Sequence, residues 1–148
     1  MSKPSVVLGF SGGMDSATAV GRLRDAGYDV VAVTLDTLGD EKMLQCAQSR
    51  ARELGVLHVV KDVREAFKEY IIQYFADSYM AGRTPAPCTV CNSAIKWKYL
   101  LEEADRLGVE FIATGHYFNI EQYNGHYYVA RAKDSRKDQS YYLWGLSQ

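Results

Sequence analysis

A glycine-rich octapeptide at residues 9–16 constrains the fold of this chain more than any other stretch. The sequence Gly-Phe-Ser-Gly-Gly-Met-Asp-Ser follows a short apolar run and precedes an alanine-rich stretch with helical periodicity. This order predicts a strand, a glycine turn and a helix. The first N–H groups of a helix have no intrahelical partner, and the helix dipole places partial positive charge there. The junction therefore favours bound anionic oxygens such as those of a phosphate.

The side chains of the octapeptide suit such a ligand. Gly12 and Gly13 leave room for a ligand to approach the backbone. Ser11 and Ser16 can add hydroxyl donors, and Asp15 can hold a metal counter-ion. An ordinary strand-to-helix turn, capped by Asp15 or Ser16, is the alternative interpretation.

Two common phosphate-binding motifs are excluded by the same residues. Walker A requires a lysine that the octapeptide lacks, and the glycine spacing differs from the Rossmann fingerprint. The string Ser-Gly-Gly-Met-Asp-Ser instead resembles the pyrophosphate loop of the PP-loop ATPases, adenylating enzymes that split ATP between its α and β phosphates. The resemblance implies that ATP binds here with Mg²⁺. The ATP-binding residues that it implies in the loop are Gly9, Phe10, Ser11, Gly12, Gly13, Met14, Asp15 and Ser16.

Strand and helix patterns alternate along the rest of the chain. The predicted strands are 5–10, 29–35, 56–61 and 109–114, and the predicted helices are 17–26, 42–54, 63–80 and a last helix from residue 92 or 93 to 107. Right-handed βαβ connections place the glycine loop at the carboxyl edge of the sheet, where ligands bind. We therefore predict one α/β domain over residues 1–148, a Rossmann-like, doubly wound, mostly parallel sheet of the PP-loop ATPase kind.

Two further patterns stand out. Aromatic residues between positions 67 and 79 recur at helical spacing, and we interpret this stripe as core packing. Asn124 and Gly125, between the stretches 117–122 and 126–132, predict a small exposed β-hairpin. A polar loop follows, and residues 141–147 have the pattern of a helix that is beginning.

Composition limits the classes of protein that fit. The chain has 148 residues, of which 47% are hydrophobic and 24% charged, as is typical of a globular domain. Its net charge of −1 gives no global attraction for nucleic acid, so any RNA contact needs a local basic patch. There is no apolar run long enough for a membrane span and no secretory signal pattern, so we expect a cytoplasmic protein without a membrane partner.

Three cysteines, two of them in a Cys-x-x-Cys sequence, indicate chemistry or metal binding rather than a secreted disulfide framework. A Pro-x-Pro sequence around residue 86 predicts an extended chain up to Cys88. The following helix is predicted to begin just after Cys91, where the helix dipole can lower the pKa of that thiol and make it a nucleophile. Unreactive thiols, half of a zinc site, and an iron–sulfur cluster held by Cys46, Cys88 and Cys91 are the alternatives.

Three blocks downstream of the loop indicate a narrower family. They are residues 82–92 (Gly-Arg-Thr-Pro-Ala-Pro-Cys-Thr-Val-Cys-Asn), 113–117 (Ala-Thr-Gly-His-Tyr) and 137–143 (Lys-Asp-Gln-Ser-Tyr-Tyr-Leu). With the glycine loop, and in the same order, they resemble the signatures of tRNA-specific 2-thiouridylase. The resemblance implies an enzyme that adenylates the C2 oxygen of the wobble uridine in certain tRNAs and releases pyrophosphate. Sulfur from a cysteine persulfide then replaces the oxygen, so tRNA and a persulfide sulfur-donor protein are the implied partners.

The resemblance also implies roles for single residues. Leu35 would border the adenine and Gly115 would contact the nucleotide. Cys91 matches the first catalytic cysteine of the family, and the implied catalytic set is Cys91, Cys88 and Asp15. The implied tRNA-contacting segment is Lys137, Asp138 and Gln139. Nearby basic residues would suit a phosphate-contacting loop, and they are Arg131, Lys133 and Arg136.

The chain departs from the family pattern at two points. Ala86 and Cys88 stand where the family usually has asparagine and aspartate, which leaves open a disulfide between Cys88 and Cys91 or ligation of a cluster. No cysteine follows Cys91, although the family's second catalytic cysteine lies downstream. We therefore interpret the chain as the N-terminal part of a longer enzyme, without its central and C-terminal β-rich domains, and expect it to bind nucleotide but not to thiolate tRNA by itself.

Two other functions are consistent with the sequence. One is another PP-loop adenylase, such as an amidotransferase-type synthetase or a nucleobase-modifying ligase, although a synthetase that uses ammonia needs no thiol in the proline loop. The other is a non-catalytic module that binds nucleotide or RNA. Release of pyrophosphate from ATP in the presence of tRNA would separate an enzyme from such a module.

Overall fold

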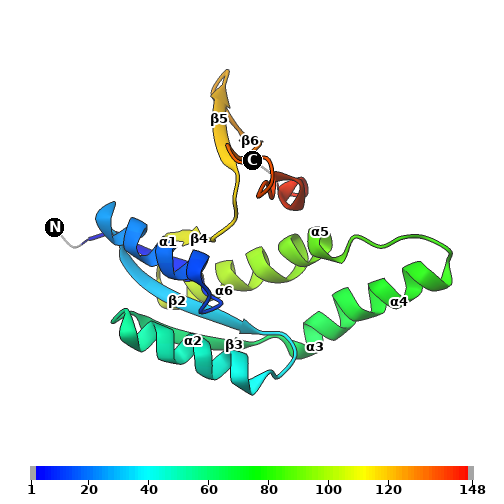
Figure 1. Cartoon of the computed structure of the whole chain (residues 1–148), viewed down its shortest axis with the longest axis horizontal. Coiled ribbons are helices and arrows are strands. Elements are labelled where there is room, and N and C mark those ends of the chain that lie inside the picture. Colours follow the sequence, from blue (N-terminus) through cyan, green and yellow to red (C-terminus); the bar gives the residue numbers. More distant parts are fainter. Residues whose placement is uncertain (1–2, 147–148) are drawn as a thin grey trace.

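The computed structural model describes residues 3–146 as an α/β fold (Figure 1). The elements follow one another as β1 Ser5–Gly9, α1 Met14–Asp25, β2 Asp29–Asp36, α2 Glu41–Glu53, β3 Leu57–Asp62, α3 Arg64–Phe67, α4 Gln73–Met80, α5 Pro87–Cys91, α6 Lys98–Leu107, β4 Phe111–Ala113, β5 Asn119–Tyr123 and β6 His126–Ala130. Short π-helical segments, Lys68–Ile72 and Asn92–Trp97, join α3 to α4 and α5 to α6 into two long helices. The alternation of strand and helix that the sequence predicts is confirmed.

Four parallel strands form the sheet, in the order β3-β2-β1-β4. β1 lies at the centre, where Val6 is opposite Val30 on one side and Phe111 on the other. The chain winds from β1 through β2 to β3 in one direction and returns to place β4 on the other side of β1. The strand order therefore reverses beside β1, and the carboxyl end of such a reversal is where open α/β sheets bind ligands. The predicted Rossmann-like, PP-loop type of fold is confirmed.

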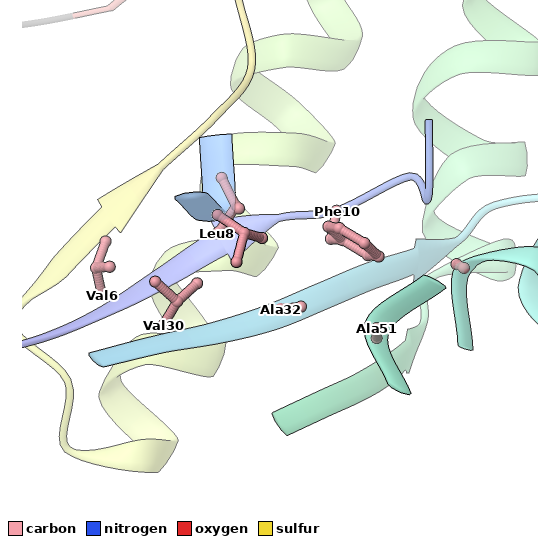
Figure 2. Close-up of a cluster of buried hydrophobic side chains, with 8 residues drawn as sticks. Val6, Leu8, Phe10, Val30, Ala32 and Ala51 are labelled. Atoms are coloured by element: carbon pink, nitrogen blue, oxygen red, sulfur yellow. The ribbon is translucent and has the colours of Figure 1, made fainter. Parts of the chain in front are cut away.

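Helices cover both faces of the sheet because alternate residues of the central strands point to opposite sides. Val6, Leu8 and Phe10 pack with Val30 and Ala32 against α1 and α2 (Figure 2). On the other face, Val7 and Val33 pack against Leu100 and Ala104 of α6. Since the side chains of Val7, Leu8 and Val33 are fully buried, each contributes about 1.5 to 3 kcal/mol of transfer free energy. The glycine loop is thus anchored to the best-packed strand.

The helix from Arg64 to Met80 has the predicted length, but its aromatic stripe is not core. Only its base is packed, with Ile71 in a cluster with Val63 and Ile95. Tyr70, just before Ile71, is 44% exposed, and further along Phe75 is 44% and Tyr79 is 57% exposed. Figure 1 shows the reason, because α4 reaches past the edge of the sheet, away from the helices that would bury it. The prediction that the stripe packs into the core is wrong for this outer half.

The next helix begins earlier than predicted. The chain was expected to stay extended up to Cys88, but α5 starts at Pro87. Proline is well tolerated at a first helical position, where its missing N–H has no partner to lose and its fixed φ suits the helix. The helix continues to Leu107 and ends at Gly108 in the left-handed conformation, as the sequence predicts.

The hairpin after β4 is confirmed. β5 and β6 pair antiparallel with Tyr123 opposite His126, and the two loop residues, Asn124 and Gly125, have φ values of 50° and 80°. Positive φ at both positions is what a type I′ turn requires. A 3-10 helix at Ser140–Leu143 follows, where the sequence predicts a helix opening, and residue 147 of that prediction lies outside the described residues.

Candidate active site

A pocket of about 380 Å³ opens at the carboxyl edge of the sheet, where the strand order reverses. Its size lies within the usual range of small-molecule sites. It is formed by the glycine loop, the end of β2, the α5–α6 helix and the turn after β4. The lining residues are Gly9, Phe10, Ser11, Asp15, Ser16, Val33, Thr34, Leu35, Thr37, Met43, Cys91, Lys96, Leu100, Thr114, Gly115, His116 and Gln139.

Gly12 fixes the shape of the loop. Its φ is +77°, and a Cβ at this position would lie 2.7 Å from the Cα of Ala47 in α2. Both the conformation and the close approach therefore require glycine. Gly13 is the N-cap of α1 and receives no side-chain cap, so the predicted alternative of a turn capped by Asp15 or Ser16 is wrong.

The serines of the loop lie close together. Ser16 Oγ donates a 3.0 Å hydrogen bond to the carbonyl oxygen of Gly13, and Ser11 Oγ lies 3.4 Å from Ser16 Oγ. Ser11 is exposed and Ser16 is buried at the first turn of α1. The first-turn amides of α1 have no intrahelical acceptor, so the pocket presents hydroxyl and N–H donors together at a positive helix end. This combination suits a phosphate.

Seven of the ten residues predicted to bind ATP line the pocket. These are Gly9, Phe10, Ser11, Asp15, Ser16, Leu35 and Gly115. Phe10 contributes backbone, because its ring lies in the core and its carbonyl oxygen accepts a hydrogen bond from Thr34. Gly12, Gly13 and Met14 are not among the lining residues, and the Met14 side chain is 82% exposed.

The three cysteines lie in different surroundings. Cys91 is half-buried and lines the pocket, whereas Cys88 and Cys46 are exposed and do not. All three are free thiols in the structure. Cys88 lies close to the hydroxyl of Tyr142, whose pKa is raised to about 12, chiefly by its hydrogen bond with Tyr141 and to a smaller extent by burial and by Cys88. The pocket therefore receives one thiol, from Cys91.

The expected lowering of the Cys91 pKa is wrong in this structure. Because α5 begins at Pro87, Cys91 lies in the second turn of the helix rather than at its start, and Cys88 is the thiol nearer the N-terminus. Burial raises the pKa of the Cys91 thiol, while the nearby ammonium of Lys96 acts in the opposite direction. Because burial is the larger of the two effects, the neutral thiol form of Cys91 is favoured in the free protein.

His116 forms one wall of the pocket as a neutral imidazole. Its ring stacks on Trp97, with the ring centroids 6.4 Å apart, and its Nδ1 lies 2.8 Å from the hydroxyl of Thr114. Burial, assisted by the charge of Lys96, lowers the pKa of His116 to about 4. These contacts fit a role for His116 in orienting the turn by hydrogen bonds rather than in polarising a phosphate. Trp97 lies in no motif, so its stacking on His116 has no signal in the sequence.

The turn after β4 is tied to both the glycine loop and the segment 137–139. Tyr117 donates from its hydroxyl to Oδ1 of Asp15. The N–H of Tyr117 donates to the side-chain oxygen of Gln139 at 2.9 Å, and the N–H of Gln139 donates to the carbonyl oxygen of Tyr117 at 2.8 Å. Thr37 and Met43, which also line the pocket, were missed, although the loop after β2 leaves the same sheet edge.

The three residues predicted to contact tRNA have mostly internal partners. The Lys137 ammonium lies 5.2 Å from the centre of the Tyr117 ring. Asp138 accepts hydrogen bonds from the N–H of Ala132 and from the backbone and hydroxyl of Ser140. These contacts give the segment a structural role, and its contact with tRNA stays a prediction.

The donor set of the pocket fits one of the two metal cofactors expected from the sequence. One carboxylate, Asp15, stands beside the phosphate-suited helix end, and Mg²⁺ commonly binds one or two carboxylates together with substrate phosphates. An iron–sulfur cluster does not fit. Within residues 3–146 there is no group of three or more His, Cys, Asp or Glu side chains that could hold a metal ion, so Cys46, Cys88 and Cys91 are not brought together.

The fold and the pocket define a HUP-domain protein of the PP-loop type. Residues 4–148 match the family model described as tRNA methyl transferase HUP domain, and the chain belongs to that family. Among solved structures, a predicted subunit of tRNA methyltransferase from Methanocaldococcus jannaschii is similar, with a TM-score of 0.57 and 20% identity over 77% of this chain and 53% of that one. NH3-dependent NAD synthetase from Campylobacter jejuni shares the fold at a TM-score of 0.51, with 19% identity over 75% of this chain and 47% of that one.

Curated relatives are more similar in sequence. The tRNA-specific 2-thiouridylase MnmA 1 of Bacteroides fragilis is 47% identical over 97% of this chain and 40% of its own length. The tRNA-specific 2-thiouridylase MnmA of Amoebophilus asiaticus is 45% identical over 100% of this chain and 43% of its own length. The chain therefore spans less than half the length of these relatives. Among residues 3–146, no helix is both long and apolar enough to cross a membrane.

Proposed function

We propose that this chain is the ATP-binding, thiol-bearing portion of a tRNA-uridine 2-sulfurtransferase. The observation that carries the proposal is that one pocket is lined by both the glycine loop and Cys91. The names of the curated relatives, which are 40 to 47% identical to this chain, support the same substrate class. A pocket that only bound nucleotide would have no use for a thiol beside the phosphate site.

In the first step, the C2 oxygen of the uridine attacks the α-phosphorus of ATP and pyrophosphate leaves. The loop donors at Ser11, Ser16 and the first turn of α1 would hold the phosphates and offset their charge. Mg²⁺, held by Asp15 and phosphate oxygens, would supply further charge neutralisation. Leu35 and the backbone of Gly115 would border the base and sugar.

In the second step, sulfur replaces the activated oxygen. A donor protein's persulfide gives its terminal sulfur to Cys91, and the donor leaves as a thiol. The terminal sulfur of the Cys91 persulfide attacks C2, and AMP leaves with the former C2 oxygen. A second thiol then attacks Sγ of Cys91, which releases 2-thiouridine and leaves a disulfide for an external thiol to reduce. In the family pattern this second thiol comes from a downstream segment, so we expect no 2-thiouridine from this chain alone; Cys88, one helical turn before Cys91, is the nearer of its two other thiols in sequence.

Lys96 is the cation best placed to favour the reactive thiolate. It lines the pocket beside Cys91 and opposes the effect of burial on that thiol. A phosphate in the pocket would in turn be attracted to the same ammonium. The amidotransferase-type synthetase stays the second candidate, because solved NAD synthetases share the fold.

The test measures the two half-reactions separately. With ATP, Mg²⁺ and unmodified substrate tRNA, the protein should release pyrophosphate, and release should depend on the tRNA. With a persulfide donor, mass spectrometry of alkylated protein should find the extra sulfur on Cys91. Cys91→Ser should keep the first reaction and lose the second. Pyrophosphate release that requires ammonia and a carboxylate, and not tRNA, would identify a synthetase instead.

A further inference from the structure

A second hollow, of about 600 Å³, is lined by both partners of the Asp15–Tyr117 hydrogen bond. We call it the α1 groove. Its walls are the outer side of α1 and the base of the hairpin, and its floor is the segment that follows β4. The lining residues are Asp15, Thr18, Ala19, Arg22, Leu23, Ala113, Thr114, Gly115, His116, Tyr117, Phe118, Asn119, Ala132, Lys133 and Asp134.

The α1 groove is continuous with the pocket. Asp15, Thr114, Gly115 and His116 line both hollows. A ligand that lies in the groove is therefore next to the pocket at Gly115, whose backbone lines both hollows. The two hollows are therefore neighbours, of about 380 and 600 Å³, on the two sides of the residues that they share.

The charges in the α1 groove favour an anion. Arg22 on the α1 wall and Lys133 on the hairpin wall are exposed, and neither has an acidic partner among the described residues. The acids of the groove are both engaged, because Asp15 accepts from Tyr117 and Asp134 pairs with Arg136. The two free cations therefore determine which ligands the groove attracts.

A comparison within α1 shows that Arg22 is unusual. Arg24, in the same last turn, donates from its guanidinium to the carbonyl oxygens of Leu54 and Gly55, at 2.6 and 2.8 Å. It holds α1 to the end of α2 and has a structural role. Arg22 has no such bond among the described residues and faces the groove.

We propose that the α1 groove holds the RNA backbone that flanks the target uridine, with Arg22 and Lys133 each contacting a phosphate. This inference rests on the proposed function, which requires an RNA strand to bring one base into the pocket. Half-buried Phe118, on the floor of the groove, offers an aromatic edge or face to a neighbouring base. The groove thus adds two cations to the single one, Lys137, of the segment 137–139.

The test compares two charge-matched double variants of the protein. Arg22→Gln with Lys133→Gln removes the two groove cations. Arg52→Gln with Lys42→Gln removes two exposed cations of α2 that line neither hollow. The probe is a stem-loop RNA of an anticodon arm with an unmodified wobble uridine, and binding is followed by fluorescence anisotropy at several salt concentrations.

We expect the groove variant to bind the RNA at least about tenfold more weakly, with a salt-dependence slope smaller by about two. The α2 variant should bind like the unmodified protein, and both variants should keep their affinity for ATP. RNA affinity and slope that are unchanged in the groove variant would overturn the inference and leave the proposed function standing. A protein that binds ATP but shows no RNA binding even at low salt would overturn both.

Discussion

The hydroxyl of Tyr117 donates a hydrogen bond of 2.5 Å to Oδ1 of Asp15, a residue 102 positions earlier in the chain. This bond joins the turn after β4 to the first turn of α1, at the boundary between the pocket and the α1 groove. The same contact raises the pKa of the Tyr117 phenol, so the phenol stays a donor well into the alkaline range. Tyr117 therefore positions the carboxylate that we assign to the metal-bound phosphates.

Tyr117→Phe should remove the hydrogen bond to Asp15 and little else. The aromatic ring that contacts the Lys137 ammonium and the backbone hydrogen bonds with Gln139 are both kept. We expect the rate constant of tRNA-dependent pyrophosphate release to fall by up to about tenfold, with a smaller change in KM for ATP. Tyr123→Phe, at an exposed hairpin position, is the matched control. Equal loss in both variants, or a change confined to KM, would contradict the assignment.

The glycine loop gives a prediction about stability. Gly12→Ala should destabilise the fold by about 2 kcal/mol or more, because the new Cβ meets the backbone of α2 and the residue has a positive φ. Gly21→Ala, in the middle of α1 with no atom within 4 Å of the new Cβ, should stabilise it by up to about 1 kcal/mol. Urea unfolding of the two variants checks both signs. A Gly12→Ala protein as stable as the unmodified one would mean that the loop is not packed against α2 as described.

The neutral imidazole of His116 predicts a pH dependence of stability. Its pKa is about 4 in the folded chain and near 6.5 when unfolded, so on acidification the unfolded chain takes up the proton first. Stability should therefore be full above pH 6.5 and fall as the pH drops toward 4. His116→Gln should make the loss of stability on acidification smaller. Burial also lowers the pKa of His58, but His58 is present in both the variant and the unmodified protein and does not contribute to the difference between them. Denaturation at several pH values from 7 to 4 measures the difference, and identical pH profiles would show that His116 is not buried as described.

The thiols give a prediction about reactivity. In the free protein, alkylation should label exposed Cys88 faster than half-buried Cys91, and the apparent pKa of Cys91 should lie above the ordinary cysteine value. Lys96→Ala should slow the labelling of Cys91 further because it removes the opposing charge. Lys98→Ala is the control, since that ammonium lies near the rings of Tyr70 and Tyr99. Faster labelling of Cys91 than of Cys88 would contradict the surroundings that we describe.

The sequence predicts the parts of this protein that local patterns determine. The buried runs of β1 and β2 and the Asn124–Gly125 turn were found because strand burial and positive φ leave a direct signal. The location of the pocket at the carboxyl edge of the sheet could also be predicted, because the order of strands and helices places the glycine loop at that edge.

The misses have a common physical cause, which is that they depend on distant packing. The stripe with Phe75 has the periodicity of a buried helix face, but burial depends on what lies beside α4. The Cys91 pKa depends on how far the pocket encloses the thiol, and the position of the helix start at Pro87 changed which thiol is near its dipole. The hydrogen bond between Asp15 and Tyr117 joins two motifs that lie 102 positions apart, and neither motif by itself indicates the other.

The central claim is that nucleotide and reactive thiol share one pocket, and protection of single cysteines tests it most directly. The rates at which Cys46, Cys88 and Cys91 are alkylated are measured by mass spectrometry with and without ATP and Mg²⁺. At ATP ten times above its dissociation constant, about one-eleventh of the sites stay free, so the labelling of Cys91 should slow by about tenfold.

Cys88 and Cys46 should label at unchanged rates, because neither lines the pocket. A Ser11→Ala, Ser16→Ala double variant, which should bind ATP about tenfold or more weakly, should lose most of the protection at the same ATP concentration. If bound ATP leaves the labelling rate of Cys91 unchanged, or slows Cys88 and Cys46 to the same extent, the nucleotide and the thiol do not share this pocket.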